Sequence, residues 1–287
     1  MAAPRKLLLG LIGSGIQRSL TPAMQEAEAR HHGLRVHYQL IDLDATASGV
    51  SELPMLIAAA RIMGFAGLNI TYPCKQAVLP LLDELSEEAA AMGAVNTVVN
   101  RAGRLVGHNT DGWGWSWGFR RALPGADLSR VVLLGAGGAG SAVAHAALRL
   151  GAGRLQIVDT DPAKAAGLAQ ALEARYGAGR ARAASDVAAA LADATGLIHA
   201  TPTGMDKLPG LPLPDGLLQP RLWVSEVVYF PIETALLKAA RARGCATVDG
   251  GTMAVGQAVG AFELFTGCAP DAPRMEAHLR SMLAAAR

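Results

Sequence analysis

Apolar runs alternate with segments of helical spacing through the first part of the chain. Three of these runs have the length and composition of β-strands and cover residues 6–13, 37–44 and 67–72. Residues 22–32 and 52–63, which lie between the runs, place apolar side chains at helical intervals. This order predicts a βαβαβ arrangement at the start of the fold.

Shorter elements follow as far as residue 123. Two strand-like runs, 97–100 and 104–108, are joined across Ala102–Gly103, so we expect a mixed sheet in this first domain. The spacing also predicts three helical segments: 75–82, 87–92 and 112–123. The turn at Pro124–Gly125 is the best candidate for a domain boundary.

Strands and helices alternate again from residue 131, as is typical of βαβ units with a parallel sheet. The pattern predicts a helix over 234–243 and strands over 131–134, 154–159, 196–201, 221–228 and 246–248. Two closing helices are expected at 252–265 and 274–286, and nothing in the pattern ties them to this second domain.

Composition narrows the possible partners. A chain of 287 residues exceeds the usual size of one hydrophobic core, which favours two domains. The net charge of +2 gives no overall field for nucleic acid or an anionic membrane, so we expect a small-molecule ligand. The three cysteines form no CxxC pair, and no apolar run reaches the roughly 18 residues of a membrane helix. We therefore expect a cytoplasmic protein without disulfides.

The segment VVLLGAGGAGSA, residues 131–142, is the most informative stretch of the chain. A buried strand runs into a glycine-rich turn and then into an alanine-rich helix, which is the pattern of a dinucleotide site. Gly135 would permit the tight turn, Gly137 the approach of a pyrophosphate, and Gly140 close packing of helix and strand. A second strand ends in Asp159, at the spacing expected for an acid that binds ribose. The alternative is a glycine turn without a ligand.

Two junctions between a strand and a helix in the first domain carry groups suited to proton transfer. GLNITYPCK ends at Lys75 in a helix's first turn, where the positive end of the helix dipole would favour the neutral amine. GHNTDG places Asp111 at or near a helix N-cap. Because strand ends of an α/β sheet gather at one edge, both side chains could face one hydroxyl. Taken singly, Lys75 could be a surface lysine and Asp111 a simple cap.

A third junction lies in GSGIQRSLTPAM, where Ser19 and Thr21 precede Pro22. Thr21 is expected to be the N-cap of a helix that has proline at its first position. The same loop could hold a carboxylate at the helix N-terminus. Trp113, Trp115 and Trp117 fan around a helix and are expected to serve packing, and the histidines show no spacing of metal ligands, so no metal is expected.

Together these motifs resemble the shikimate/quinate dehydrogenase family over essentially the whole chain. The resemblance rests on SLTPAM, GLNITYPCK, GAVNTVV, GHNTDG, GAGGAG, ATPTGM, VVYFPIET and DGGTMAVGQAV. It implies an N-terminal α/β substrate domain with a mixed sheet and a Rossmann-type, doubly wound parallel nucleotide domain. The expected bounds are 1–123 with 252–287 for the substrate domain and 124–251 for the nucleotide domain.

The resemblance also implies residue roles. Lys75 and Asp111 would be the catalytic pair, with Lys75 moving the hydroxyl proton while a hydride passes to the nicotinamide. Ser19 and Thr21 would bind the ring carboxylate. The other substrate-binding residues would be Thr71, Asn96, Tyr229 and Gln257. The coenzyme would be held by Gly135, Ala136, Gly137, Gly138, Ala139, Gly140, Asp159, Thr201, Pro202, Val227 and Met253.

Four departures from the family pattern concern substrate and coenzyme. Arg18 and Thr21 replace a histidine and a serine, Gln25–Glu26 replaces His–Asn, and Thr252 stands where glycine is common. Members that use NADP carry an arginine after the second nucleotide-domain strand, whereas this chain has Asp159–Thr160–Asp161. A carboxylate there accepts hydrogen bonds from ribose hydroxyls and repels a 2′-phosphate, so NAD is the expected coenzyme.

The leading hypothesis is therefore an NAD-dependent shikimate dehydrogenase that interconverts shikimate and 3-dehydroshikimate, with quinate as a second substrate. The acidic coenzyme segment is similar to that of the catabolic quinate/shikimate branch of a family that also serves aromatic amino acid biosynthesis. One alternative keeps the chemistry and changes the ring substituent, as in aminoshikimate dehydrogenases. A second is a non-catalytic sensor of NAD and a ring acid. A monomer or homodimer is expected.

Overall fold

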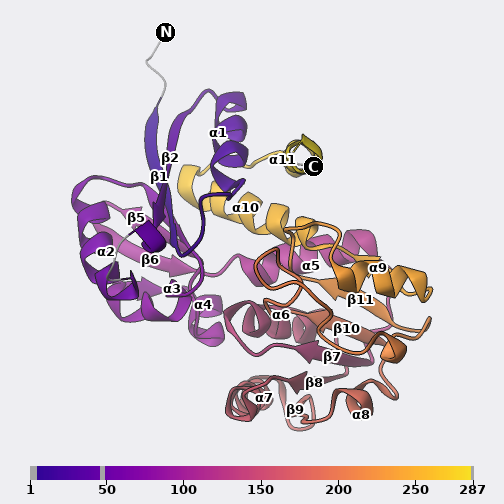
Figure 1. Cartoon of the computed structure of the whole chain (residues 1–287). Helices are drawn as coiled ribbons and strands as arrows, with labels where there is room; N and C mark the ends of the chain where they lie inside the picture. Colours follow the sequence, from indigo (N-terminus) through magenta and orange to yellow (C-terminus); the bar gives the residue numbers. More distant parts are fainter. Residues whose placement is uncertain (1–4, 46–48, 286–287) are drawn as a thin grey trace. The chain divides into compact units, whose positions relative to one another are not determined.

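The computed structural model describes residues 5–45 and 49–285. The chain divides into two compact units (Figure 1). Unit 1 comprises Met1–Thr110 and Gln257–Arg287, and unit 2 comprises Asp111–Gly256. Both are α/β structures, each with a six-stranded sheet, and the expected fold class is confirmed.

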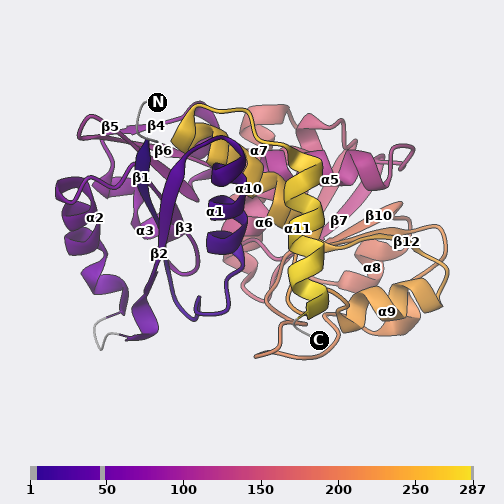
Figure 2. The same cartoon turned by 90° about the horizontal axis from the view of Figure 1, so that it is seen from above.

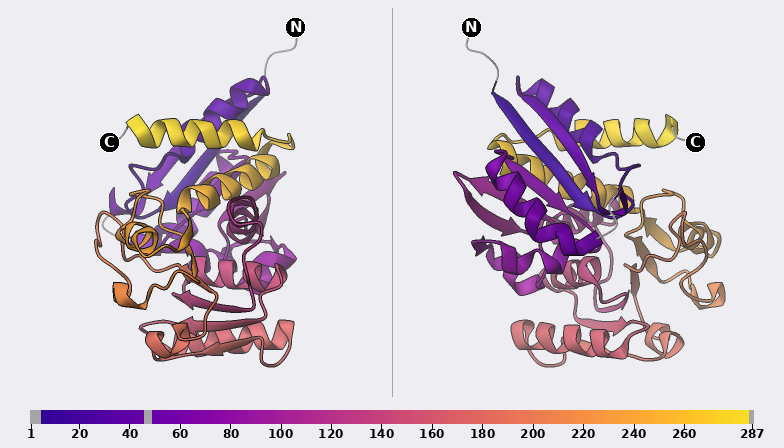
Figure 3. Two further views of the ribbon diagram at one scale, coloured as in Figure 1. Left: turned by 90° about the vertical axis from the view of Figure 1, so that its right-hand side faces the viewer. Right: turned by 60° about the vertical axis from the view of Figure 1, so that its left-hand side comes forward.

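The sheet of unit 1 is mixed. Its strands are β1 (Lys6–Gly13), β2 (Arg35–Asp42), β3 (Gly67–Ile70), β4 (Glu84–Leu85), β5 (Thr97–Arg101) and β6 (Arg104–His108), in the order β2-β1-β3-β5-β6-β4. β1 runs parallel to β2 (Figure 3) and to β3. β5 runs antiparallel to β3 and to β6, and the tight turn at Ala102–Gly103 predicts its pairing with β6. The helices that begin in this unit are α1 (Thr21–His31), α2 (Leu53–Ile62), α3 (Cys74–Ala77), α4 (Glu87–Met92) and α11 (Ala272–Ala285).

Unit 1 buries both faces of β1, which explains why this strand reads as one continuous apolar run. Ile12 packs in a cluster with Leu53 and Ile57 of α2. Leu9 and Leu11 pack in another cluster with Phe265, near the end of α10 (Gly250–Thr266). α11 lies beside α1 (Figure 2) and is tied to it by Arg274, whose guanidinium bonds the buried Glu28 carboxylate at 2.6 and 2.8 Å.

The sheet of unit 2 is wholly parallel. Its strands are β7 (Arg130–Leu134), β8 (Arg154–Val158), β9 (Ala181–Ala183), β10 (Gly196–His199), β11 (Trp223–Glu226) and β12 (Ala246–Val248), in the order β12-β11-β10-β7-β8-β9. The helices are α5 (Asp111–Ala122), α6 (Gly138–Arg149), α7 (Pro162–Tyr176), α8 (Val187–Leu191) and α9 (Ala235–Ala242). The strand order reverses between β7 and β10, and ligands of such sheets bind at the carboxyl ends of the strands at this point.

Helix α5 belongs to unit 2, although the sequence placed it in the first domain. Its Trp115 is buried, stacks on Phe119 and donates a hydrogen bond of 2.9 Å from Nε1 to the Ser225 hydroxyl of β11. Helix α5 also closely approaches the start of α10, because a Cβ on Gly256 would stand 2.5 Å from the Gly114 Cα. These tertiary contacts, which no local pattern reports, move the first boundary to Thr110 and the second to Gly256.

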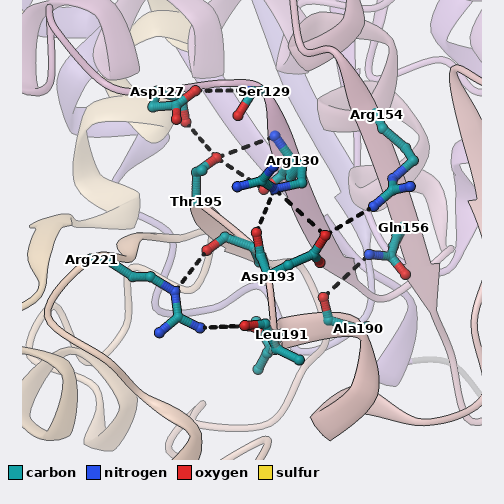
Figure 4. A network of polar contacts seen from close by, with 12 residues as sticks. Asp127, Ser129, Arg130, Arg154, Gln156, Ala190, Leu191, Asp193, Thr195 and Arg221 are labelled. Atoms are coloured by element: carbon teal, nitrogen blue, oxygen red, sulfur yellow. Dashed lines mark hydrogen bonds and ion pairs between the residues drawn. The ribbon is translucent and has the colours of Figure 1, made fainter.

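The amino ends of the unit 2 strands are joined by an exposed polar network (Figure 4). The Asp193 carboxylate pairs with Arg130 at 3.6 Å and Arg154 at 3.3 Å, and both arginines stand at the start of a strand. Arg221 donates to the carbonyls of Leu191 and Ala192 at the end of α8. The network therefore holds the connection between α8 and β10 at the amino edge of the sheet.

Candidate functional site

One group of candidate residues, in unit 1, lies at the carboxyl ends of β1 and β3. Because the two strands run parallel, the segments that follow them leave from one edge. Backbone hydrogen bonds of 2.9 Å, from Thr71 N–H to the Ile12 carbonyl and from Ser14 N–H to the Tyr72 carbonyl, hold these segments together. The edge thus carries Thr71 and the loop that leads to Ser19.

Asp42, at the end of the neighbouring strand β2, organises that loop. Its carboxylate accepts hydrogen bonds from Gly15 N–H at 2.9 Å, Ile16 N–H at 3.2 Å and Gln17 Nε2 at 3.0 Å. Burial acts to raise the pKa of Asp42, but these hydrogen bonds and one from Asp44 N–H outweigh it and lower the pKa. Sequence reasoning missed this residue, because the predicted strand 37–44 ran two residues past the end of β2 at Asp42.

The predicted N-cap at Thr21 is wrong. Leu20 precedes the helix in a helical conformation, and Thr21 is the first residue of α1. The Thr21 N–H donates instead to the Ser19 hydroxyl at 3.3 Å, because the chain has already turned into the helix one residue earlier. Both hydroxyl-bearing side chains are half-buried, and their role toward a substrate stays a prediction.

Lys75 is the second residue of α3 and is half-buried, as the expected helix start requires. This helix has only four residues, so its macrodipole is too short to support the electrostatic argument made from the sequence. The Lys75 carbonyl accepts a hydrogen bond of 2.9 Å from Val95 N–H, which fixes the backbone at this position. Lys75 belongs to unit 1, whereas Asp111 is buried at the start of α5 in unit 2.

Asn96 is linked through Thr110 to Gln257, another of the predicted substrate residues in unit 1. Its side chain accepts a hydrogen bond from Thr110 N–H at 2.8 Å and donates one to the Thr110 hydroxyl at 2.9 Å. That hydroxyl in turn donates to the Gln257 carbonyl at 3.0 Å, and Gln25 Nε2 donates to the Ala258 carbonyl at 2.9 Å. Asn96 is therefore a buried anchor that holds both the residue before Asp111 and the part of α10 that carries Gln257.

The glycine-rich turn of unit 2 has the shape that the sequence predicts. Gly135 adopts a φ of 101°, and a Cβ on Gly140 would collide with the Gly135 carbonyl oxygen. A Cβ on Gly137, by contrast, would meet no described atom within 4 Å. Gly137 therefore faces open space, and Gly138 and Ala139 follow it as the first residues of α6. A pyrophosphate fits such a cradle because the N–H groups of a first helical turn have no partners within the helix.

Asp159 lies directly after β8 and contacts the same turn. Its carboxylate accepts hydrogen bonds from Ala136 N–H at 2.7 Å and from Asp161 N–H at 2.9 Å. Partial burial acts to raise the pKa of Asp159, but these two hydrogen bonds and the charge of Lys164 lower it, so the group is an anion at neutral pH. The structure thus brings Asp159 and the glycine-rich turn together, as predicted.

The other predicted coenzyme residues lie at the ends of β10 and β11 or on α10. Thr201 is half-buried and follows β10 closely, and Val227 N–H donates to the His199 carbonyl at 3.0 Å and to Glu226 Oε1 at 2.9 Å. Pro202 is exposed beside Thr201. Sequence reasoning missed the buried pair of His199 and Glu226, which joins these segments.

Tyr229 and Met253 also belong to unit 2. Burial raises the pKa of the Tyr229 hydroxyl, which is therefore a neutral hydrogen-bond donor. Met253 is buried in the large core cluster of the unit. Thr252, which departs from the family pattern, packs against Gly118 of α5 and donates a hydrogen bond of 3.0 Å to the Asp249 carbonyl.

The tryptophans divide between packing and surface. Trp115 is core, as expected, whereas Trp113 and Trp117 stack with ring centroids 6.4 Å apart and Trp113 is half exposed.

Within residues 5–45 and 49–285, no group of three or more His, Cys, Asp or Glu side chains has the arrangement of a metal site. None of the helices in those residues combines the length and hydropathy needed to cross a membrane.

Comparison with known proteins extends over nearly the whole chain. Residues 11–98 match the family model of the shikimate dehydrogenase substrate binding domain, and residues 250–280 match that of the shikimate 5'-dehydrogenase C-terminal domain. The shikimate dehydrogenase (NADP(+)) of Streptomyces avermitilis is 58% identical over 277 residues, which is 96% of this chain and 95% of that protein. The quinate/shikimate dehydrogenase (NAD(+)) of Corynebacterium efficiens is 50% identical over 279 residues, with coverages of 96% and 98%.

A solved structure agrees with these relatives. The quinate dehydrogenase of Corynebacterium glutamicum in complex with NAD superposes with a TM-score of 0.91 at 47% identity and covers 96% of this chain and 99% of its own. Because 96% of the chain is covered, the match includes residues of both units. By its sequence and its fold, the chain belongs to the shikimate/quinate dehydrogenase family.

Proposed function

We propose that this protein oxidises shikimate reversibly to 3-dehydroshikimate with NAD, and that quinate is a second substrate. The observation that carries the coenzyme assignment is the Asp159 carboxylate, held beside the glycine-rich turn by the N–H groups of Ala136 and Asp161. Relatives of this chain carry names with either NAD(+) or NADP(+), so family membership alone does not assign the coenzyme.

The residues of unit 2 fit a dinucleotide. The open space at Gly137 and the first turn of α6 suit the pyrophosphate, and Asp159 suits the hydroxyls of the adenosine ribose. Thr201, Pro202 and Val227 are assigned to the coenzyme as well, and Met253 is assigned to the nicotinamide. When bound, NAD supplies the acceptor for the hydride that leaves the substrate carbon.

An anionic Asp159 disfavours NADP for an electrostatic reason. The 2′-phosphate of NADP would approach a carboxylate whose pKa is already lowered by its N–H donors, and the two negative charges repel each other. Lys164 is the cation that acts on this carboxylate, and it offsets part of the repulsion. We therefore expect a preference for NAD rather than complete exclusion of NADP.

Unit 1 supplies the groups assigned to the substrate. Ser19 and Thr21 offer hydroxyls to the ring carboxylate, and Thr71 and Gln257 offer polar groups to the ring hydroxyls. Tyr229 of unit 2 adds a neutral donor to the site. The Lys75 amine is assigned to accept the proton of the reacting hydroxyl, and Asp111 is assigned as the second member of the catalytic pair.

A kinetic panel tests this function. Purified protein is assayed with shikimate or quinate and with NAD or NADP, by the absorbance of the reduced coenzyme. We expect the highest kcat/KM with shikimate and NAD and a smaller value with quinate and NAD. Absence of turnover in all four combinations would contradict the proposal, whereas a higher value with NADP would overturn the coenzyme assignment.

The role of Lys75 is tested by Lys75→Ala, with Lys238→Ala on the exposed face of α9 as the matched control. Loss of a general base lowers kcat by about 10²- to 10⁴-fold. Shikimate affinity, measured by calorimetry, should change far less, because the amine acts on the proton and not on the ring. Unchanged turnover in Lys75→Ala would remove the proposed proton transfer.

A further inference from the structure

Helix α5 carries aromatic side chains on two opposite faces. On the inner face Trp115 and Phe119 are buried, and Phe119 packs edge-on against Trp223 of β11. On the outer face Trp113 is 50% exposed, and its ring stacks on that of Trp117 with the two planes 20° apart. Packing in the core cluster of unit 2 therefore accounts for Trp115 and Phe119 but not for the outer pair.

Arg121 extends the outer pair into a row of three side chains. Its guanidinium carbon lies 4.3 Å from the centroid of the Trp117 ring, which is a cation–π contact. Because residues four apart share a helix face, Trp113, Trp117 and Arg121 form one stripe, which we call the α5 ladder. The ladder has an aromatic end at Trp113 and a cationic end at Arg121, about 12 Å apart along the helix axis.

The ladder has the composition of a protein interface. Trp and Arg are enriched among the residues that dominate binding between proteins, and a half-exposed Trp leaves apolar area that a partner can remove from water. The acid of α5 is Asp111, which is buried, whereas Arg120 and Arg121 are exposed. A partner must therefore offer aromatic faces or carboxylates to the cationic end of the ladder.

A second copy of this chain meets that requirement. When two α5 helices pack antiparallel about a two-fold axis at Trp117, Trp113 of each copy lies opposite Arg121 of the other. Each guanidinium then gains an aromatic face, and the two Trp117 rings meet at the axis. A two-fold interface needs such self-complementarity, because each of its contacts occurs twice. Parallel packing would bring the two Arg121 side chains together, and like charges repel.

We propose that this protein forms a homodimer in which the α5 ladders of two copies pair antiparallel, with Trp113 of each copy against Arg121 of the other. The inference does not depend on the proposed catalytic function. Three side chains from each copy make a small contact, and interfaces at the low end of the size range are weak and reversible. We therefore expect a dissociation constant of about 1–100 µM.

Sedimentation velocity measures this dimer directly. The purified protein is examined from about 1 to 500 µM, and its weight-average mass should rise from that of a monomer toward that of a dimer. Tryptophan fluorescence should shift to the blue over the same range, because Trp113 becomes buried in the contact. A protein that stays monomeric throughout would overturn the proposal.

Opposite charges at Trp113 test the antiparallel pairing. Trp113→Glu would place a carboxylate opposite Arg121 of the second copy, whereas Trp113→Lys would place a cation there. Both changes remove the same exposed ring, so an effect of the lost ring alone would be equal for the two. We expect the dissociation constant of Trp113→Lys to exceed that of Trp113→Glu by about tenfold or more. Equal behaviour of the two variants, or a tighter dimer for Trp113→Lys, would contradict the pairing.

Ile62→Ser is the matched control, because Ile62 is 86% exposed on α2 of unit 1 and its loss removes apolar surface elsewhere. Its dissociation constant should stay within about twofold of the wild-type value. Loss of the dimer in Ile62→Ser would assign the contact to α2 and overturn the proposal. Neither readout uses turnover, so failure of the dimer and failure of the proposed function are separate results.

Discussion

The two edges of the parallel sheet in unit 2 differ in whether their charged side chains are buried or exposed. At the carboxyl edge the side chains of His199 and Glu226 are 0% exposed and every oxygen of the carboxylate is bonded. At the amino edge Asp193 is 53% exposed and pairs with Arg130 and Arg154, which are 47% and 37% exposed. The carboxyl edge thus holds a buried pair whose carboxylate oxygens all accept hydrogen bonds, and the amino edge holds solvent-exposed ion pairs.

The difference shows what each edge contributes. Exposed ion pairs add little to stability and constrain side chains loosely. A buried pair gives no more stability than apolar packing would, but it fixes the directions of its hydrogen bonds. The buried network at the carboxyl edge therefore contributes fixed directions of hydrogen bonding at the ends of β10 and β11 rather than added stability.

The largest expected effect comes from Glu226→Ala. This change leaves the His199 imidazole, the Thr234 hydroxyl and two backbone N–H groups without their acceptor. We expect the free energy of unfolding to fall by about 3–5 kcal/mol, as for other broken buried pairs. Urea unfolding measures the effect. A decrease of less than about 1 kcal/mol in the free energy of unfolding would contradict the expected difference between the buried pair and the exposed ion pairs.

Gly140→Ala should have the next largest effect. The added methyl group collides with the Gly135 carbonyl, so we expect about 1–3 kcal/mol of destabilisation together with weaker binding of NAD. Gly137→Ala is the matched control, because its methyl group meets no described atom and only a ligand would be obstructed. It should retain the melting temperature and weaken NAD binding about tenfold. Wild-type affinity in Gly137→Ala would contradict a pyrophosphate at this turn.

Asp193→Ala tests the amino edge. It removes two exposed ion pairs, so we expect a loss of about 0.5–1 kcal/mol in the free energy of unfolding. The loss should shrink in 1 M salt, which screens exposed charges. The values of kcat and KM should equal those of the wild type. A change in KM for NAD would contradict the expectation that the amino edge takes no part in binding the coenzyme.

The smallest effect on stability is expected from Asp159→Asn, and it depends on pH. Hydrogen bonds hold the folded-state pKa of Asp159 below its ordinary value of 3.8, so the stabilisation by its carboxylate is complete above that value and is lost as the pH falls through the folded-state pKa. At pH 7 we expect the variant to be less stable by about 0.5 kcal/mol. The difference in unfolding free energy between wild type and variant should narrow from pH 5 to pH 3. A difference that widens as the pH falls would mean that the pKa of Asp159 is raised in the folded state instead of lowered.

Local patterns predicted the parts of this molecule that neighbouring residues determine. The glycine-rich turn, with Gly135 in a left-handed conformation and Gly140 against it, follows from the segment itself. Asp159 was found because its spacing from that turn is fixed by the βαβ unit. The course of most strands and helices was predicted for the same reason.

Contacts between distant residues could not be predicted in this way. The pairing of His199 with Glu226 depends on the register of β10 and β11, and the membership of α5 depends on the bond from Trp115 to Ser225. The short strands β4 and β9 and the helices α7 and α8 were not predicted. Thr21 failed as an N-cap because Leu20 is already in a helical conformation, so that Thr21 is the first residue of the helix.

We propose that the carboxyl edge of unit 2 selects NAD over NADP through the Asp159 carboxylate. The most direct test is the ratio of kcat/KM for NAD to that for NADP, measured with shikimate for wild-type protein and Asp159→Asn. We expect a ratio above 1 in the wild type and a fall of about tenfold or more in the variant, since one charge repulsion is removed. A wild-type preference for NADP, or a ratio that Asp159→Asn leaves unchanged, would contradict the claim.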